Sequence, residues 1–82
     1  MIPIEIFEYK KKWLPGYCVS IHSDLRSRAK SWLKQLEQHE YQYKEFTDNY
    51  EDTICFENQR ISQEFASDSI FMAWVVKSTR TG

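Results

Sequence analysis

Two cysteines and two histidines are the side chains whose types suit metal binding or nucleophilic catalysis: Cys18, His22, His39 and Cys55. A zinc finger or knuckle needs close pairs of Cys or His, and this spacing provides none. Cys18 and His22 would lie about 13 Å apart along one strand, at about 3.3 Å per residue. A Cys–His nucleophile also needs an oxyanion hole and an orienting group, and no motif marks either. We therefore expect no metal, no cofactor and no enzyme.

Four carboxylates gather around a predicted hairpin: Glu45, Asp48, Glu51 and Asp52. Two of them could serve acid–base catalysis or bind Mg²⁺, but such clusters usually form a solvated loop. A phosphate-binding loop needs several glycines close together, and the chain has only Gly16 and Gly82. The hairpin is therefore expected to contribute charge rather than chemistry.

Charge is sorted along the chain. Between residues 10 and 34 there are seven basic residues and one acid, and between residues 37 and 57 there are seven acids and one base. The net charge is only −1. A segregated field of this kind orients partners and speeds association without naming a partner.

Basic and aromatic side chains provide a second candidate, a nucleic-acid interface. Arg26, Lys30 and Lys34 recur at i, i+4 and i+8 on the outer side of a predicted helix, with Arg28 beside them. Tyr41 and Tyr43 share one face of a predicted strand, where aromatic rings can stack on bases. The surrounding acids would repel phosphate, and a plain solvated helix face is the structural alternative.

The cysteines and the apolar runs bear on the compartment. Met1 begins a segment without the basic region of a signal peptide, so we expect a cytoplasmic protein with free, buried thiols. No apolar run approaches the roughly 20 residues of a transmembrane helix, so no membrane partner is expected.

Alternating apolar and polar residues predict short strands, and Pro15 with Gly16 predicts a turn between the first two. On the second strand, Tyr17, Val19 and Ile21 share the core face. Asp48 and Asn49 predict a hairpin turn between the third and fourth. The four ranges are 2–9, 17–22, 41–46 and 52–56.

Helical periodicity is clearest over residues 24–38, with Ser23 as the expected cap. Its apolar positions are Leu25, Ala29, Trp32, Leu33 and Leu36. Asn58 is expected to cap a shorter helix that turns Ile61 and Phe65 toward the core. Residues 70–76 are continuously apolar, which favours a buried strand over continuation of that helix. Residues 78–82 are expected to form a flexible tail.

The predicted order of elements is a single α+β domain over 1–82. An extra N-terminal strand and turn (1–14) precede a ferredoxin-like βαββαβ core (15–77), an antiparallel sheet with two helices on one face. The stretch 52–58, running into Ile61 and Phe65, resembles small ferredoxin-like proteins of tailed phages. That resemblance implies fold and a phage origin, and it carries no catalytic residue.

We expect the chain to be a non-enzymatic protein-interaction module that binds a larger protein or complex. If the resemblance holds, it would inhibit a host enzyme or defence complex in the host cytoplasm. The expected partner-binding residues are Arg26, Arg28, Lys30, Lys34, Tyr41, Tyr43, Glu45, Glu51 and Asp52. The aromatic residues Trp13, Tyr41, Tyr43 and Trp74 exceed what so small a core need hide, although Trp32 and Trp74 also suit the core. The alternative function is a small RNA- or single-strand-binding domain.

Overall fold

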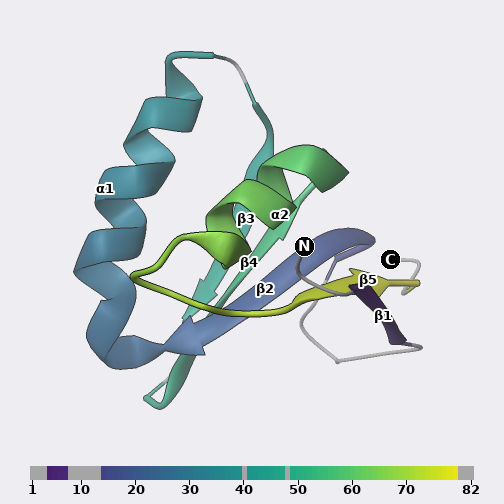
Figure 1. Ribbon diagram of the computed structural model, residues 1–82, viewed down its shortest axis with the longest axis horizontal. Coiled ribbons are helices and arrows are strands. Elements are labelled where there is room, and N and C mark those ends of the chain that lie inside the picture. Colours follow the sequence, from purple (N-terminus) through teal and green to yellow (C-terminus); the bar gives the residue numbers. More distant parts are fainter. Residues whose placement is uncertain (1–3, 8–13, 40, 48, 80–82) are drawn as a thin grey trace.

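A computed structural model describes residues 4–7, 14–39, 41–47 and 49–79 of the chain. Within these residues, five strands and two α-helices follow one another in the order β1, β2, α1, β3, β4, α2, β5 (Figure 1). Their bounds are β1 Ile4–Phe7, β2 Gly16–His22, α1 Arg26–Glu37, β3 Tyr43–Thr47, β4 Glu51–Phe56, α2 Gln59–Ser67 and β5 Val75–Ser78. A 3-10 turn, Ser23–Leu25, leads from β2 into α1.

The strands form one sheet in the order β1-β5-β2-β4-β3. The four strands β5, β2, β4 and β3 pair with one another in antiparallel fashion, and β1 pairs with β5 in parallel. Gly16 opens β2 with a φ of +135°, and a Cβ there would lie 2.6 Å from the carbonyl oxygen of Phe56. Only glycine fits this position, because it needs both the unusual backbone conformation and the close approach of β4.

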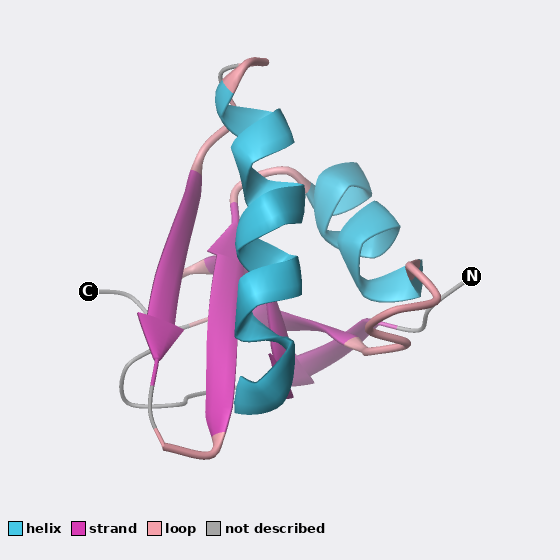
Figure 2. Ribbon diagram, turned by 90° about the vertical axis from the view of Figure 1, so that its left-hand side faces the viewer, coloured by secondary structure: helices cyan, strands magenta, loops and turns pink. Residues whose placement is uncertain are grey.

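Both helices cover the same face of the sheet (Figure 2). The core between the two layers combines Val19 of β2, Ile54 and Phe56 of β4, Leu33 of α1 and Phe65 of α2. The helical periodicity predicted this face of α1 correctly: Ala29, Leu33 and Leu36 are buried, while Leu25 and Trp32 are partly buried and pack against the core. The α+β class with two helices on one face is confirmed.

The two helices begin differently from each other. Asn58 caps α2 as predicted, because its side-chain oxygen accepts a hydrogen bond from the Ile61 amide at 3.1 Å. Ser23 does not cap α1. The Nδ1 atom of His22 accepts from the Asp24 amide at 3.1 Å, and the Ser23 hydroxyl instead donates to the Asn49 carbonyl at 3.3 Å.

The apolar run 70–76 is not one strand. Residues 69–71 turn, 72–74 are irregular, and β5 begins only at Val75. The predicted tail also starts too early, since Ser78 is buried at the end of β5. Residues 80–82 lie outside the described residues, as do Trp13 and Asp48.

Candidate partner-binding surfaces

One of the predicted surface pairs is an internal contact. Arg26 donates from Nε to both carboxylate oxygens of Asp52, at 3.1 and 2.8 Å, and from Nη2 to Oδ1 at 2.9 Å. Asp52 is fully buried, so a partner cannot reach it, and we remove it from the predicted binding surface. A basic residue of the first charge block thus neutralises an acid of the second, in the fork geometry in which Arg pairs best with carboxylate.

Two other cations of α1 also lie near acids of the same chain. Lys30 and Lys34 line a cavity of about 200 Å³ together with Glu37, Tyr43 and Glu45. The Oε1 atom of Glu45 is buried and has no hydrogen-bond partner among the described residues. Much of the charge that is sorted in the sequence is therefore mixed in space, and only Arg28 of the predicted basic residues lies exposed away from these acids.

Tyr43 lies on the helix-covered side of the sheet. Its hydroxyl donates to Oε1 of Glu37 on α1 at 2.9 Å, and its ring is 6.5 Å from that of Phe56 in the core. Burial raises the pKa of Tyr43, and the hydrogen bond and negative charge of Glu37 and the charge of Glu45 raise it further. Tyr41, just before β3, also packs against the core. The two tyrosines therefore do not form the open stacking surface that the nucleic-acid alternative needs.

The β3–β4 hairpin is tied to the start of α1. The amide of Ser23 donates to the Tyr50 carbonyl at 3.0 Å, beside the Ser23–Asn49 bond. Glu51 is half-buried at the start of β4, directly opposite His22 of β2. The hairpin is thus anchored to its own domain.

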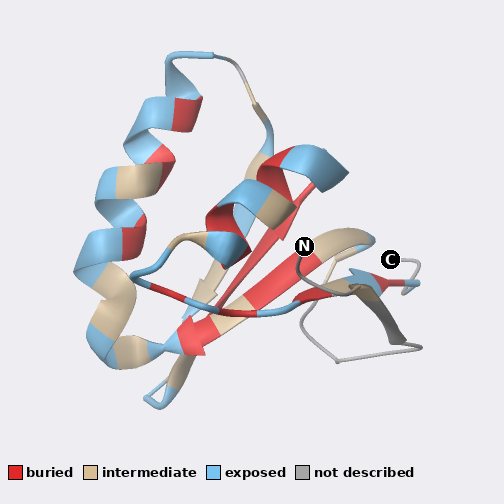
Figure 3. Cartoon of the chain, in the orientation of Figure 1, coloured by how far each residue is buried: buried red, intermediate tan, exposed pale blue. Residues whose placement is uncertain are grey.

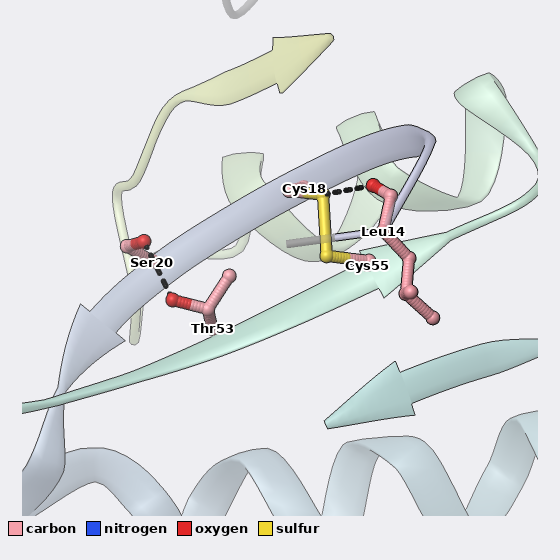
Figure 4. The surroundings of a disulfide bond; sticks show 5 residues. All are labelled: Leu14, Cys18, Ser20, Thr53 and Cys55. Atoms are coloured by element: carbon pink, nitrogen blue, oxygen red, sulfur yellow. Dashed lines mark hydrogen bonds between the residues drawn. A yellow bond between two sulfur atoms is a disulfide. The ribbon is translucent and has the colours of Figure 1, made fainter. Parts of the chain in front are cut away.

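The two cysteines form a disulfide, so the expectation of free thiols is wrong (Figure 4). Cys18 and Cys55 are directly opposite each other on β2 and β4, with Cα atoms 4.0 Å apart. They lie on the face of the sheet away from the helices, where Phe46 and Val76 pack against them and Ser20 contacts Thr53 through their hydroxyls at 3.1 Å. Disulfides are rare in a reducing cytoplasm, so this bond does not clearly fit the compartment that the sequence predicts.

The segment before β5 exposes three large apolar side chains that the predicted site did not include. Ile70, Met72 and Trp74 are 42, 77 and 57% exposed. They alternate with buried Phe71, Ala73 and Val75 (Figure 3). We call Ile70, Met72 and Trp74 the apolar trio. The sequence contained a signal for this exposed surface. If one side of the apolar run 70–76 is buried, its other side must expose apolar residues, because the run contains no polar ones.

The backbone of this segment is held in a strained form. Met72 has a φ of 45°, in the left-handed region that costs a side-chain-bearing residue roughly 1–2 kcal/mol. Asp68 fixes the turn, since its carbonyl accepts from the Phe71 and Met72 amides at 2.9 Å and its side chain accepts from the Ile70 amide at 2.9 Å. The Ala73 amide donates to the Ala66 carbonyl at 2.8 Å, which joins the segment to α2.

A groove of about 270 Å³ runs between α1 and α2, which lie side by side in Figures 1 and 2. Buried Leu36 and Ile61 form part of its lining, and Trp32 and Tyr41 line it with aromatic rings. Arg60 and Glu64 come from the exposed side of α2. We call this the interhelical groove.

Among the described residues, no group of three His, Cys, Asp or Glu side chains is arranged to hold a metal ion. In the same part of the chain, neither helix has the length and apolar character needed to cross a bilayer. No family model matches the chain, and no curated protein or solved structure matches it. The described residues form a small α+β domain.

Proposed function

We propose that this chain is a non-enzymatic protein-interaction module that docks onto a larger protein through the apolar trio. The supporting observation is the exposure of Ile70, Met72 and Trp74, which alternate with buried residues in one short segment. Outward positions of a half-buried segment are ordinarily polar, and clustered exposed apolar groups mark interaction sites. Trp is also among the residues that dominate binding energy at protein interfaces.

The conformation of Met72 supports the same function. The left-handed backbone of Met72 opposes folding stability, and its exposed side chain gains no burial in return. This uncompensated cost at one residue is explained if a partner covers the side chain. The matching partner surface is an apolar pocket, and charge plays a smaller part than the sequence suggested, because Arg26 is paired internally with Asp52.

We further propose that the sheet is of the ferredoxin-like type. The order β5-β2-β4-β3, with α1 and α2 following β2 and β4, supports the split βαβ plan. A phage origin, with a host enzyme or defence complex as the partner, stays a prediction of the resemblance.

The test uses a photocrosslinking amino acid at position 74 of the full chain, with position 38, just after α1, as the exposed control. A protein crosslinked from position 74 but not from position 38 is then purified, and its binding to the wild-type chain is measured. Met72→Asn and Trp74→Ser should each weaken binding about 30-fold, as hot-spot residues do. Gln38→Ala should leave it unchanged.

Met72→Asn also separates binding from folding. Asparagine tolerates the left-handed backbone better than methionine, so the free energy of unfolding should not fall. Equal crosslinking from positions 74 and 38, or a partner that binds both trio variants as tightly as wild type, would remove the apolar trio as the docking surface.

A further inference from the structure

We infer that the interhelical groove is a second, separate binding site, and that it takes an aromatic group carrying one carboxylate. The groove lies between the second half of α1 and the first turns of α2, and it shares no lining residue with the apolar trio. At about 270 Å³ it is slightly smaller than the usual ligand pocket, which suits one aromatic side chain with its carboxylate rather than a cofactor.

The aromatic lining is held in place by the core. The ring of Trp32 meets that of Phe65 edge to face, with centroids 5.0 Å apart, and Phe65 is fully buried. Leu36 and Ile61, which also line the groove, belong to the same core. Because these side chains are fixed by packing, an aromatic ligand would find a preformed apolar surface.

The polar side chains of the groove determine the orientation of the ligand. Nη2 of Arg60 reaches the hydroxyl of Tyr41 at 3.5 Å, and Arg60 has no carboxylate partner in the described part of the chain. Glu64 lies one turn further along α2 and lines the same groove. A ligand carboxylate therefore pairs with Arg60 beside Tyr41, while its ring points toward Trp32. The positive end of α2 adds to the attraction, since Arg60 is in its first turn.

The probes are N-acetyl-phenylalanine, its C-terminal amide, and acetate. Binding of each probe is measured from the NMR chemical shifts of the backbone N–H groups of the full chain. N-acetyl-phenylalanine should bind with a Kd of about 1 mM, as expected for a ligand of this size, and should shift Trp32, Tyr41 and Arg60. The amide should bind about fivefold more weakly, because it cannot pair with Arg60. Acetate alone should not bind measurably.

Arg60→Gln should abolish the preference for the acid over the amide. Arg28→Gln is the matched control, because it removes the same charge from an exposed position outside the groove, and it should keep the preference. The tripeptide Gly-Gly-Phe tests whether the natural aromatic carboxylate is a peptide C-terminus or a free small molecule. Tighter binding than N-acetyl-phenylalanine indicates a peptide C-terminus, and weaker binding indicates a free small molecule. Equal affinity for acid and amide, or no shift in the groove at 10-fold the expected Kd, would overturn the proposal. Neither result bears on crosslinking through the apolar trio.

Discussion

Arg26 of α1 donates hydrogen bonds to both carboxylate oxygens of Asp52 on β4, at 2.8 to 3.1 Å. This pair links the basic segment of the chain to the acidic segment. Asp52 is fully buried, whereas the Arg26 side chain is 39% exposed. The pair sits where α1 begins, so it fixes the first turn of the helix against the sheet. Charge sorting along the sequence thus contributes to the packing of α1 on β4.

Removing the cation from this pair should destabilise the fold strongly. Arg26→Met leaves a buried, unpaired carboxylate, and we expect the free energy of unfolding to fall by about 3 kcal/mol, at the lower end of the range for broken buried pairs because Arg26 is partly solvated. Arg26→Met combined with Asp52→Leu should recover most of the loss. Urea unfolding of the wild type, the single variant and the double variant measures these changes. As a control, Arg28→Met, at an exposed position, should change the free energy of unfolding by less than about 0.5 kcal/mol. Equal losses for Arg26→Met and Arg28→Met would contradict the assignment.

Truncation of two aromatic residues, Phe65 and Trp74, should change the free energy of unfolding by very different amounts. Phe65 is fully buried and contacts the rings of Trp32, Phe56 and Phe71, so Phe65→Ala should cost about 3–5 kcal/mol. Trp74 is 57% exposed, and Trp74→Ala should change stability by less than about 0.5 kcal/mol. Thermal unfolding compares them. If Phe65→Ala has no folded baseline, Phe65→Leu should still cost about 1 kcal/mol. A larger loss for Trp74→Ala than for the Phe65 variants would show that the core is wrongly placed.

The disulfide should contribute strongly to stability. It joins residues separated by 37 positions, and closing a loop of that length restricts the unfolded chain by about 4 kcal/mol. Reduction, or Cys18→Ala with Cys55→Ala, should lower the urea midpoint accordingly, and the double variant should not respond to reductant. Thiol titration of denatured, unreduced protein should find no free thiol. Two free thiols per chain would show that the bond does not form.

Stability should decline in alkali because of Tyr43. Burial and the neighbouring Glu37 and Glu45 raise its pKa above the ordinary value near 10, so the folded state holds the phenolic proton more tightly than the unfolded chain does. This contribution is fully present below about pH 10 and is lost as the pH rises through the raised pKa. Urea unfolding between pH 8 and 11 should show the decline, and Tyr43→Phe should show less of it. Tyr17→Phe serves as the control, and an identical decline in both variants would refute the role of Tyr43.

The sequence predicted the elements better than it predicted the surfaces. Periodicity located the buried face of α1, and Asn58 located the start of α2, because both depend on local spacing. The prediction of a buried strand over 70–76 was wrong. A continuous apolar run is typical of a strand buried on both faces, but the same run is found here where every second side chain is exposed to solvent. Periodicity cannot distinguish these two cases.

The disulfide was missed although its signals were present. On the second and fourth predicted strands, Cys18 and Cys55 alternate with the residues predicted to face the core. Both cysteines were therefore expected on the side of the sheet away from that core. In a split βαβ plan those strands are neighbours, but local sequence does not set the register that brings the two residues face to face. The same limit hid the Arg26–Asp52 pair, since long-range contacts decide which charges remain free to meet a partner.

The bond between Cys18 and Cys55 divides the chain into a covalent ring, an N-terminal arm that carries β1, and a C-terminal arm. The ring encloses α1, β3 and most of β4, whereas α2, the apolar trio and β5 lie on the C-terminal arm. A single protease cut in the chain between Cys18 and Cys55 would leave both fragments linked until a reductant is added. A cut after α2 would instead separate β5, together with any trio residue beyond the cut, from the covalent ring, which would stay closed.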